Sequence, residues 1–140
     1  MSSTAHRQPF DTIEEAQVFL ERSPDHEKTV DVSYDRRNFN LDRTRATLAA
    51  LGDPQNEFRA IHVAGTKGKG TTCALVERCL REDGFRTGLF TSPHLQSVCE
   101  RIRIDGQPVS ETQFCALVEA VRPYVEEKRR QSPREAPTYF

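Results

Sequence analysis

A glycine-rich segment at residues 64–72, Ala-Gly-Thr-Lys-Gly-Lys-Gly-Thr-Thr, constrains the fold of this chain more than any other feature. The apolar stretch 59–64 before it predicts a buried strand, and residues 71–83 after it carry apolar side chains at helical spacing. Three glycines within six residues allow a tight turn, so that consecutive N–H groups converge at the start of the helix. This pattern is typical of a phosphate-binding turn between a strand and a helix.

The side chains of the glycine-rich segment strengthen this interpretation but do not settle it. Lys69 would place a positive charge beside bound phosphate groups, and Thr71 or Thr72 offers a hydroxyl. The pattern departs from the regular P-loop, because Val63 stands where the first glycine would be and Gly70 separates the lysine from the threonine. An ordinary glycine-rich turn with exposed lysines is therefore the alternative.

A second strand is predicted at residues 86–91, after Gly84, which stands where a helix commonly ends. Together with the first strand and the helix it would form a βαβ unit, whose two strands are parallel and end at the same edge of a sheet. Ser92 follows the second strand and could supply an oxygen ligand for Mg²⁺ near the phosphates. A simple turn at the end of the strand is the alternative for Ser92, and we expect His94 to be solvated rather than catalytic.

Local signals predict the remaining elements. Residues 11–22 and 41–51 have helical periodicity, and the dipeptide Asp105-Gly106 predicts a hairpin between strands at 101–104 and 107–109. A last helix should open at Ser110, which forms a capping box with Gln113, and should kink or restart at Pro123. We expect a flexible tail at residues 1–10, and a helix end followed by a solvated linker within residues 126–140.

Charge and composition exclude several classes of protein. The chain carries 20 basic and 21 acidic side chains, so no global field attracts nucleic acid or an anionic membrane, and neither is expected as a partner. It has no apolar run long enough to span a membrane and no signal peptide, which predicts a soluble cytoplasmic protein. The four cysteines form no Cys-x-x-Cys pair and the histidines are scattered, so we expect no structural zinc.

The chain carries several motifs whose sequences and order along the chain resemble the folylpolyglutamate synthase/dihydrofolate synthase family of the Mur ligase superfamily. The resemblance extends over nearly the whole chain from about Asp11. It is carried by residues 38–43 (NFNLDR), 51–55 (LGDPQ), 62–72 (HVAGTKGKGTT), 91–95 (TSPHL), 100–102 (ERI) and 104–106 (IDG).

The resemblance implies a fold and an activity. The fold would be α/β: a P-loop-type parallel sheet flanked by helices, with a small hairpin near 101–109. The activity would be an ATP-dependent amide ligase that adds L-glutamate to the γ-carboxylate of a folate, or to dihydropteroate, through an acyl phosphate. Another Mur-type ligase and a non-catalytic nucleotide-binding module are the alternatives. Whether one or both folate activities occur, and the oligomeric state, stay open.

Family members are much longer than 140 residues. The resemblance therefore implies that residues 11–140 are the N-terminal part of the ATP-binding domain, and we expect the chain alone to be inactive as a ligase.

The resemblance also implies roles for individual residues. Lys67 takes the place of a usual asparagine, and Lys69 would be catalytic. Glu100 and Arg101 match a family motif whose role is either loop anchoring or ligand contact. The implied sites are ATP binding by Gly65, Thr66, Lys67, Gly68, Lys69, Gly70 and Thr71, magnesium binding by Ser92, and pterin binding by Arg37, Asn38, Phe39, Tyr139 and Phe140.

Overall fold

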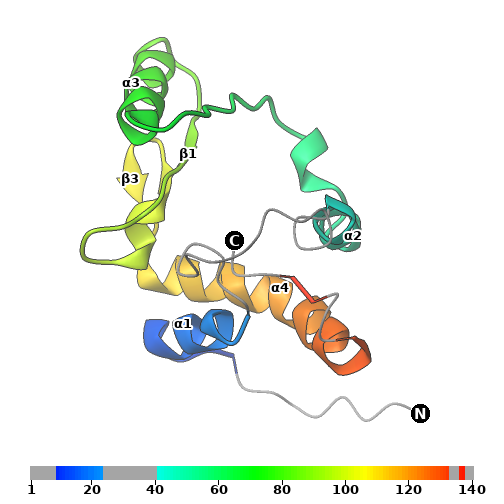
Figure 1. The fold of residues 1–140 in the computed structure, drawn as a ribbon. Helices are drawn as coiled ribbons and strands as arrows, with labels where there is room; N and C mark the ends of the chain where they lie inside the picture. Colours follow the sequence, from blue (N-terminus) through cyan, green and yellow to red (C-terminus); the bar gives the residue numbers. More distant parts are fainter. Residues whose placement is uncertain (1–8, 24–40, 133–135, 138–140) are drawn as a thin grey trace. The chain divides into compact units, whose positions relative to one another are not determined.

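The computed structural model describes residues 9–23, 41–132 and 136–137 (Figure 1). The chain divides into two compact units. Unit 1 comprises Met1–Arg59 and Cys115–Phe140, and unit 2 comprises Ala60–Phe114. No helix among the described residues is long and apolar enough to cross a membrane.

Unit 2 combines one complete α-helix, a short 3₁₀ helix, a small sheet and the first residues of a further α-helix (Figure 1). The three strands lie in chain order, and both neighbouring pairs are antiparallel. Helices together with this small sheet agree with the predicted α/β class. The elements are α3 (Lys69–Glu82), β1 (Gly88–Phe90), η2 (Val98–Arg101), β2 (Ile102–Ile104) and β3 (Gln107–Pro108).

The predicted hairpin is present. Arg103 pairs with Pro108 and Ile104 with Gln107, which leaves the two residues Asp105 and Gly106 as the turn. Both turn residues have positive φ, 49° for Asp105 and 81° for Gly106. These angles fit a type I′ turn, which matches the twist of the flanking strands and favours the Asp-Gly dipeptide.

The prediction of a parallel strand pair is wrong for the described residues. Residues 59–64 form no strand, and β1 pairs with β2 in antiparallel fashion, with Gly88 opposite Ile104. The side chain of Ile61 is 64% exposed. A strand buried on both faces requires neighbours on each side, and in the described part of the chain no strand lies alongside 59–64.

A polar network ties α3 to the sheet. The buried Glu77 accepts a 2.6 Å hydrogen bond from the Thr87 hydroxyl and pairs with Arg81 at 3.2 Å. The Thr87 N–H donates to the Asp105 carboxylate at 2.7 Å, and the Asp105 N–H donates back to the Thr87 carbonyl. Because each charged group in this network has a partner, burial of Glu77 is tolerated, and the network fixes α3 against the start of β1.

The described residues of unit 1 lie mainly in helices, and the helices predicted there are confirmed. In α1 (Ile13–Glu21) the side chain of Thr12 caps the helix, and Phe19 is buried. The other elements of unit 1 are α2 (Leu41–Ala50), η1 (Pro54–Asn56) and the part of α4 (Glu111–Gln131) that begins at Cys115.

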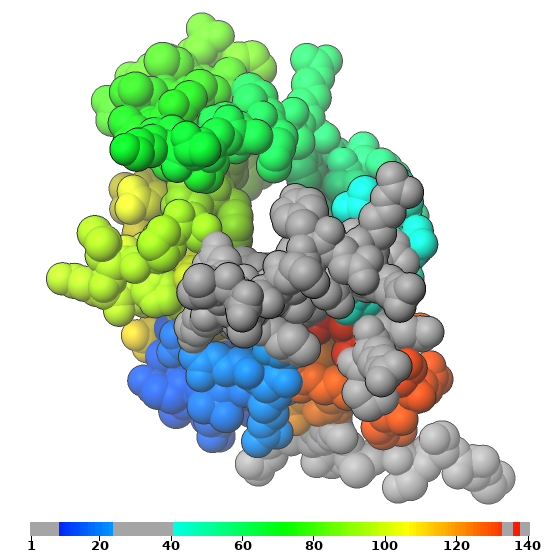
Figure 2. Space-filling model, in the orientation of Figure 1, coloured from blue at the N-terminus to red at the C-terminus, as the bar shows by residue number. Residues whose placement is uncertain are grey.

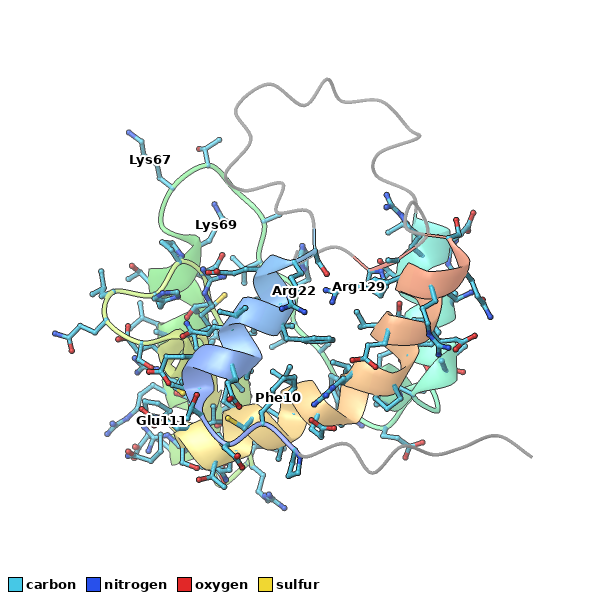
Figure 3. All side chains as sticks on the ribbon, turned by 90° about the horizontal axis from the view of Figure 1, so that it is seen from below. Phe10, Arg22, Lys67, Lys69, Glu111 and Arg129 are labelled. Carbon is cyan, nitrogen blue, oxygen red and sulfur yellow. The ribbon has the colours of Figure 1, made fainter. Side chains whose placement is uncertain are left out.

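An arginine connects α1 with α4. Arg129 donates hydrogen bonds to the Phe19 carbonyl at 3.0 Å and to the Ser23 hydroxyl at 2.7 Å, and its guanidinium lies 4.6 Å from the Phe19 ring centroid. Burial lowers the pKa of Arg129, and the nearby charge of Arg22 lowers it further. Figure 3 shows these two arginines side by side.

The start of α4 agrees with its prediction, but the helix does not restart at Pro123. Ser110 and Gln113 form the predicted capping box: the Ser110 N–H donates to the Gln113 side chain at 2.8 Å, and the Gln113 N–H donates to the Ser110 hydroxyl at 3.1 Å. Of the predicted kink or restart at Pro123, the restart is wrong, because the helix continues through this residue to Gln131.

Candidate phosphate-binding site

The glycine-rich loop ends at Gly68, which is the N-cap of α3. Gly68 has a φ of 76°, a left-handed conformation that glycine adopts without strain. The first helical hydrogen bond runs from the Thr72 N–H to the Gly68 carbonyl at 2.9 Å. No side chain caps this end of the helix. The first N–H groups of α3, together with the positive end of its dipole, can therefore bind an anion.

The two loop lysines differ in their contacts. Helix α3 begins two residues before the predicted start, so Lys69 lies in its first turn. The Lys69 ammonium donates a 2.7 Å hydrogen bond to the Gly65 carbonyl and thus spans the loop. Figure 3 shows Lys67 pointing away from the loop into solvent. The implied ATP-binding residues 65–71 are all exposed, as Figure 2 illustrates for the green surface of α3 and its preceding loop.

Ser92 lies just after β1, on the return of the chain from α3. Glu77 in α3 contacts Thr87, and the chain reverses between them, after α3, with Gly84 at a φ of 87°. From this contact, eight helical residues span about 12 Å and five extended residues about 16 Å. Counted from this contact, Lys69 and Ser92 are therefore at comparable distances along α3 and along the strand, and Ser92 is exposed.

The chemistry of Ser92 fits part of a magnesium site. Its hydroxyl oxygen is a suitable hard donor. Among the described residues, no group of three His, Cys, Asp or Glu side chains is placed to hold a metal ion. Mg²⁺ in proteins commonly keeps several waters and is bound by few side chains together with substrate phosphates. Ser92 could therefore hold the ion only in combination with other oxygen donors, such as substrate phosphates.

Glu100 anchors the segment that follows Ser92. Its carboxylate accepts 2.9 Å hydrogen bonds from the N–H groups of Leu95, Gln96 and Ser97. These backbone hydrogen bonds, with the one from Leu95 first, lower the pKa of Glu100. The sequence left two roles open for Glu100, loop anchoring and ligand contact. The structure contains the contacts expected for loop anchoring.

His94, which the sequence predicted to be solvated, makes a side-chain hydrogen bond in the structure. Arg101 is 8% exposed, and its Nε donates a 2.8 Å hydrogen bond to His94 Nδ1. Since Nδ1 accepts this bond, the neutral imidazole carries its proton on Nε2. The spacing of seven residues within an irregular loop offered no periodic signal for this pair.

Comparisons with known proteins relate this geometry to an enzyme family. The chain is 47% identical over 104 residues to "Putative folylpolyglutamate synthase" of Caenorhabditis elegans. The matched region covers 72% of this chain and 20% of that protein. It is 44% identical over 86 residues to "Dihydrofolate synthase/folylpolyglutamate synthase" of Bacillus subtilis, and this match covers 61% of the chain and 20% of that protein. The chain is homologous to part of the folylpolyglutamate synthases.

Solved folylpolyglutamate synthase structures agree with this relationship. The structure from Thermotoga maritima superposes with a TM-score of 0.76 and 29% identity, over 91% of this chain and 27% of that one. The Mycobacterium tuberculosis structure, complexed with ADP, gives 0.75 and 33%, over 91% of this chain and 26% of that one. No protein-family profile matches the chain.

The chain matches only a fraction of each of these synthases. It spans about a fifth of the length of the two curated relatives and about a quarter of the two solved structures. The predicted pterin-binding residues Arg37, Asn38, Phe39, Tyr139 and Phe140 lie outside the described residues. The described site residues are therefore those of the glycine-rich loop together with Ser92.

Proposed function

We propose that this chain provides the ATP-phosphate-binding part of a folylpolyglutamate synthase. The supporting observation is the uncapped N-terminus of α3, where Gly68 turns the backbone and the Lys69 ammonium spans the loop. The homologous enzymes and the ADP complex of a structural neighbour support ATP as the nucleotide. The proposed reaction is ATP-dependent addition of L-glutamate to the γ-carboxylate of a folate, or to dihydropteroate.

The loop would act by binding and neutralising the phosphates of ATP. In the proposed reaction the substrate carboxylate attacks the γ-phosphate, which gives an acyl phosphate and ADP, and the amino group of glutamate then displaces phosphate. The backbone N–H groups of residues 65–71 would hold the phosphate oxygens. Lys69 would exchange its bond to the Gly65 carbonyl for one to a phosphate oxygen, where its charge stabilises the transition state.

Further residues would complete the site. Ser92 would contribute one oxygen ligand to Mg²⁺ beside the phosphates. When bound there, the ion would supply charge neutralisation on the transferred group. The residues Arg37, Asn38, Phe39, Tyr139 and Phe140 would contact the pterin.

We also propose that the chain alone binds nucleotide and does not ligate, because it spans about a quarter of the solved synthases.

Nucleotide binding by the 140-residue chain tests the role of the loop. Isothermal titration with ADP should detect binding to the wild-type chain, and Lys69→Ala should weaken it at least about tenfold because a charge-assisted bond to phosphate is lost. Lys128→Ala is the control, because Lys128 lies on α4 in unit 1, where its ammonium is 5.8 Å from the Tyr124 ring centroid. Equal affinities of the wild type and Lys69→Ala would contradict the proposal.

Ligation separates a synthase from a nucleotide-binding module. In a chimera, this chain would replace the homologous segment of the Bacillus subtilis enzyme, and glutamate transfer to folate would be measured. We expect activity from the chimera and at least a hundredfold loss in its Lys69→Ala variant, about the loss seen when one group that stabilises transition-state charge is removed. A folded chimera that binds ATP but never transfers glutamate would favour the non-catalytic module.

A further inference from the structure

Ser92 lies between two points that Arg101 holds. Before Ser92, the Thr91 N–H donates to the Arg101 carbonyl at 2.9 Å and continues the pairing of β1 with β2. After it, the His94 ring accepts the 2.8 Å bond from Arg101 Nε. Because Arg101 is almost fully buried, both attachments belong to a fixed part of unit 2. The backbone of Ser92 is thus restrained on each side.

The next three residues are held by Glu100. Its Oε2 accepts from the Leu95 N–H, and its Oε1 accepts from those of Gln96 and Ser97. The hydroxyl of Ser97 accepts a hydrogen bond from the Cys99 N–H and so caps η2. Consecutive residues from 94 to 97 therefore each have a bond to the Glu100-Arg101 pair.

From these contacts we propose that Glu100 is a positioning residue, which locks residues 95–97 so that the Ser92 hydroxyl is held in place for the Mg²⁺ of a bound nucleotide. The proposal rests on the proposed function of the loop. Partners that orient a metal ligand commonly affect metal affinity as strongly as some ligands do. Three backbone donors already occupy the Glu100 carboxylate, and this favours an action through the backbone over direct contact with the ion.

Replacement of Glu100 by glutamine removes this arrangement with little change in size. Glutamine has one acceptor oxygen, and its NH₂ group would face an N–H group that needs an acceptor. Glu82→Gln is the matched control, because Glu82 lies on α3 of the same unit and makes an exposed pair with Arg78 at 2.8 Å.

Hydrogen–deuterium exchange of the 140-residue chain tests the lock itself. We expect the amides of Leu95, Gln96 and Ser97 to exchange about tenfold faster in Glu100→Gln, the factor expected for loss of a hydrogen bond to a charged group. The same amides should exchange at the wild-type rate in Glu82→Gln. Unchanged exchange in Glu100→Gln would overturn the proposal without any reference to nucleotide binding.

The dependence of ADP affinity on Mg²⁺ tests the positioning of Ser92. Affinities are measured by titration with Mg²⁺ and with EDTA. Glu100→Gln should lower the affinity about tenfold with Mg²⁺ and leave it unchanged with EDTA, because residues 65–71 are not altered. Ser92→Ala should remove the same gain from Mg²⁺.

The other outcomes have separate meanings. An equal loss with and without Mg²⁺ in Glu100→Gln would indicate general damage to the unit and overturn the positioning role. Normal Mg²⁺ dependence in Ser92→Ala or in Glu100→Gln would overturn it as well. A wild-type chain that binds no ADP in either condition would overturn the proposed function and with it the positioning role, while hydrogen exchange would still report whether the lock exists.

Discussion

Single residues of the glycine-rich loop differ in how strictly their backbone conformation limits substitution. Gly68 has a φ of 76° at the N-cap of α3, whereas Gly70 has no positive φ and lies within the first turn. A Cβ atom at either position would meet nothing within 4 Å. Any difference between substitutions at the two sites therefore comes from the backbone and not from packing.

Gly68→Ala should destabilise the chain by about 1 kcal/mol, because an L-residue in the left-handed region costs roughly that much. Gly70→Ala should instead leave the stability unchanged or raise it by up to about 1 kcal/mol, since alanine favours the helix interior. Urea unfolding followed by circular dichroism measures both changes. Equal effects of the two substitutions would show that the left-handed conformation of Gly68 is not retained in solution.

Sequence analysis predicted the ATP-binding candidates at this scale but left Glu100 undecided. Glycines and lysines between an apolar stretch and a helix make a local pattern that can be read directly from the sequence. The bonds of Glu100 to three preceding amides depend on the course of an irregular loop. The spacing Ser97-x-x-Glu100 is that of a capping box and indicates the bond from the Ser97 N–H. No spacing rule indicates the bonds from Leu95 and Gln96.

Secondary-structure elements in this chain were predictable where their signals are local. The capping box at Ser110 and the Asp105-Gly106 turn each involve residues at most four positions apart, and both are present. Residues 59–64 also carry a local signal, a short apolar run typical of a strand, but they form no strand. A strand depends on a neighbour that can be distant in sequence, so its local pattern indicates only that burial is suitable. Pro123 is likewise a local signal, here for a break in the helix, yet α4 continues through it.

The loop from β1 to η2 should respond to acid through Glu100. Backbone hydrogen bonds lower its pKa from the ordinary value of 4.5, so the folded loop favours the carboxylate. Its stabilising contribution is present above the unfolded pKa and is lost as the pH falls through the lower, folded pKa. The amide resonances of residues 95–97 should therefore shift together in an NMR titration, with a midpoint below 4.5.

Glu100→Gln provides the control for this titration, because it removes the ionisable group and should remove the shared midpoint. A midpoint at or above 4.5 in the wild type would contradict the hydrogen-bonded carboxylate. Loss of the whole fold at the same pH would be recognised by simultaneous shifts in unit 1, where Ile13 and Phe19 are buried.

At the scale of the whole chain, large apolar side chains are exposed in unit 2. Ile61 is 64% exposed, Leu75 63% and Phe90 62%. These residues come from the segment before the loop, from α3 and from β1, respectively. The solved synthase of Thermotoga maritima, which superposes on 91% of this chain, is far longer, since the chain covers only 27% of it. We expect the additional polypeptide of such an enzyme to supply the neighbours that an apolar segment such as 59–64 needs for burial.

Ile61→Lys tests this account by comparing the 140-residue chain with the chimera. In the chain alone, Ile61 is exposed, so the free energy of unfolding should change by less than about 0.5 kcal/mol. In the chimera a lysine within a buried strand would lack a partner, and we expect a loss of about 3 kcal/mol or more. Val98→Lys is the control, because Val98 is buried within unit 2 and its replacement should destabilise both proteins. A loss in the isolated chain as large for Ile61→Lys as for Val98→Lys would mean that residues 59–64 are already buried there.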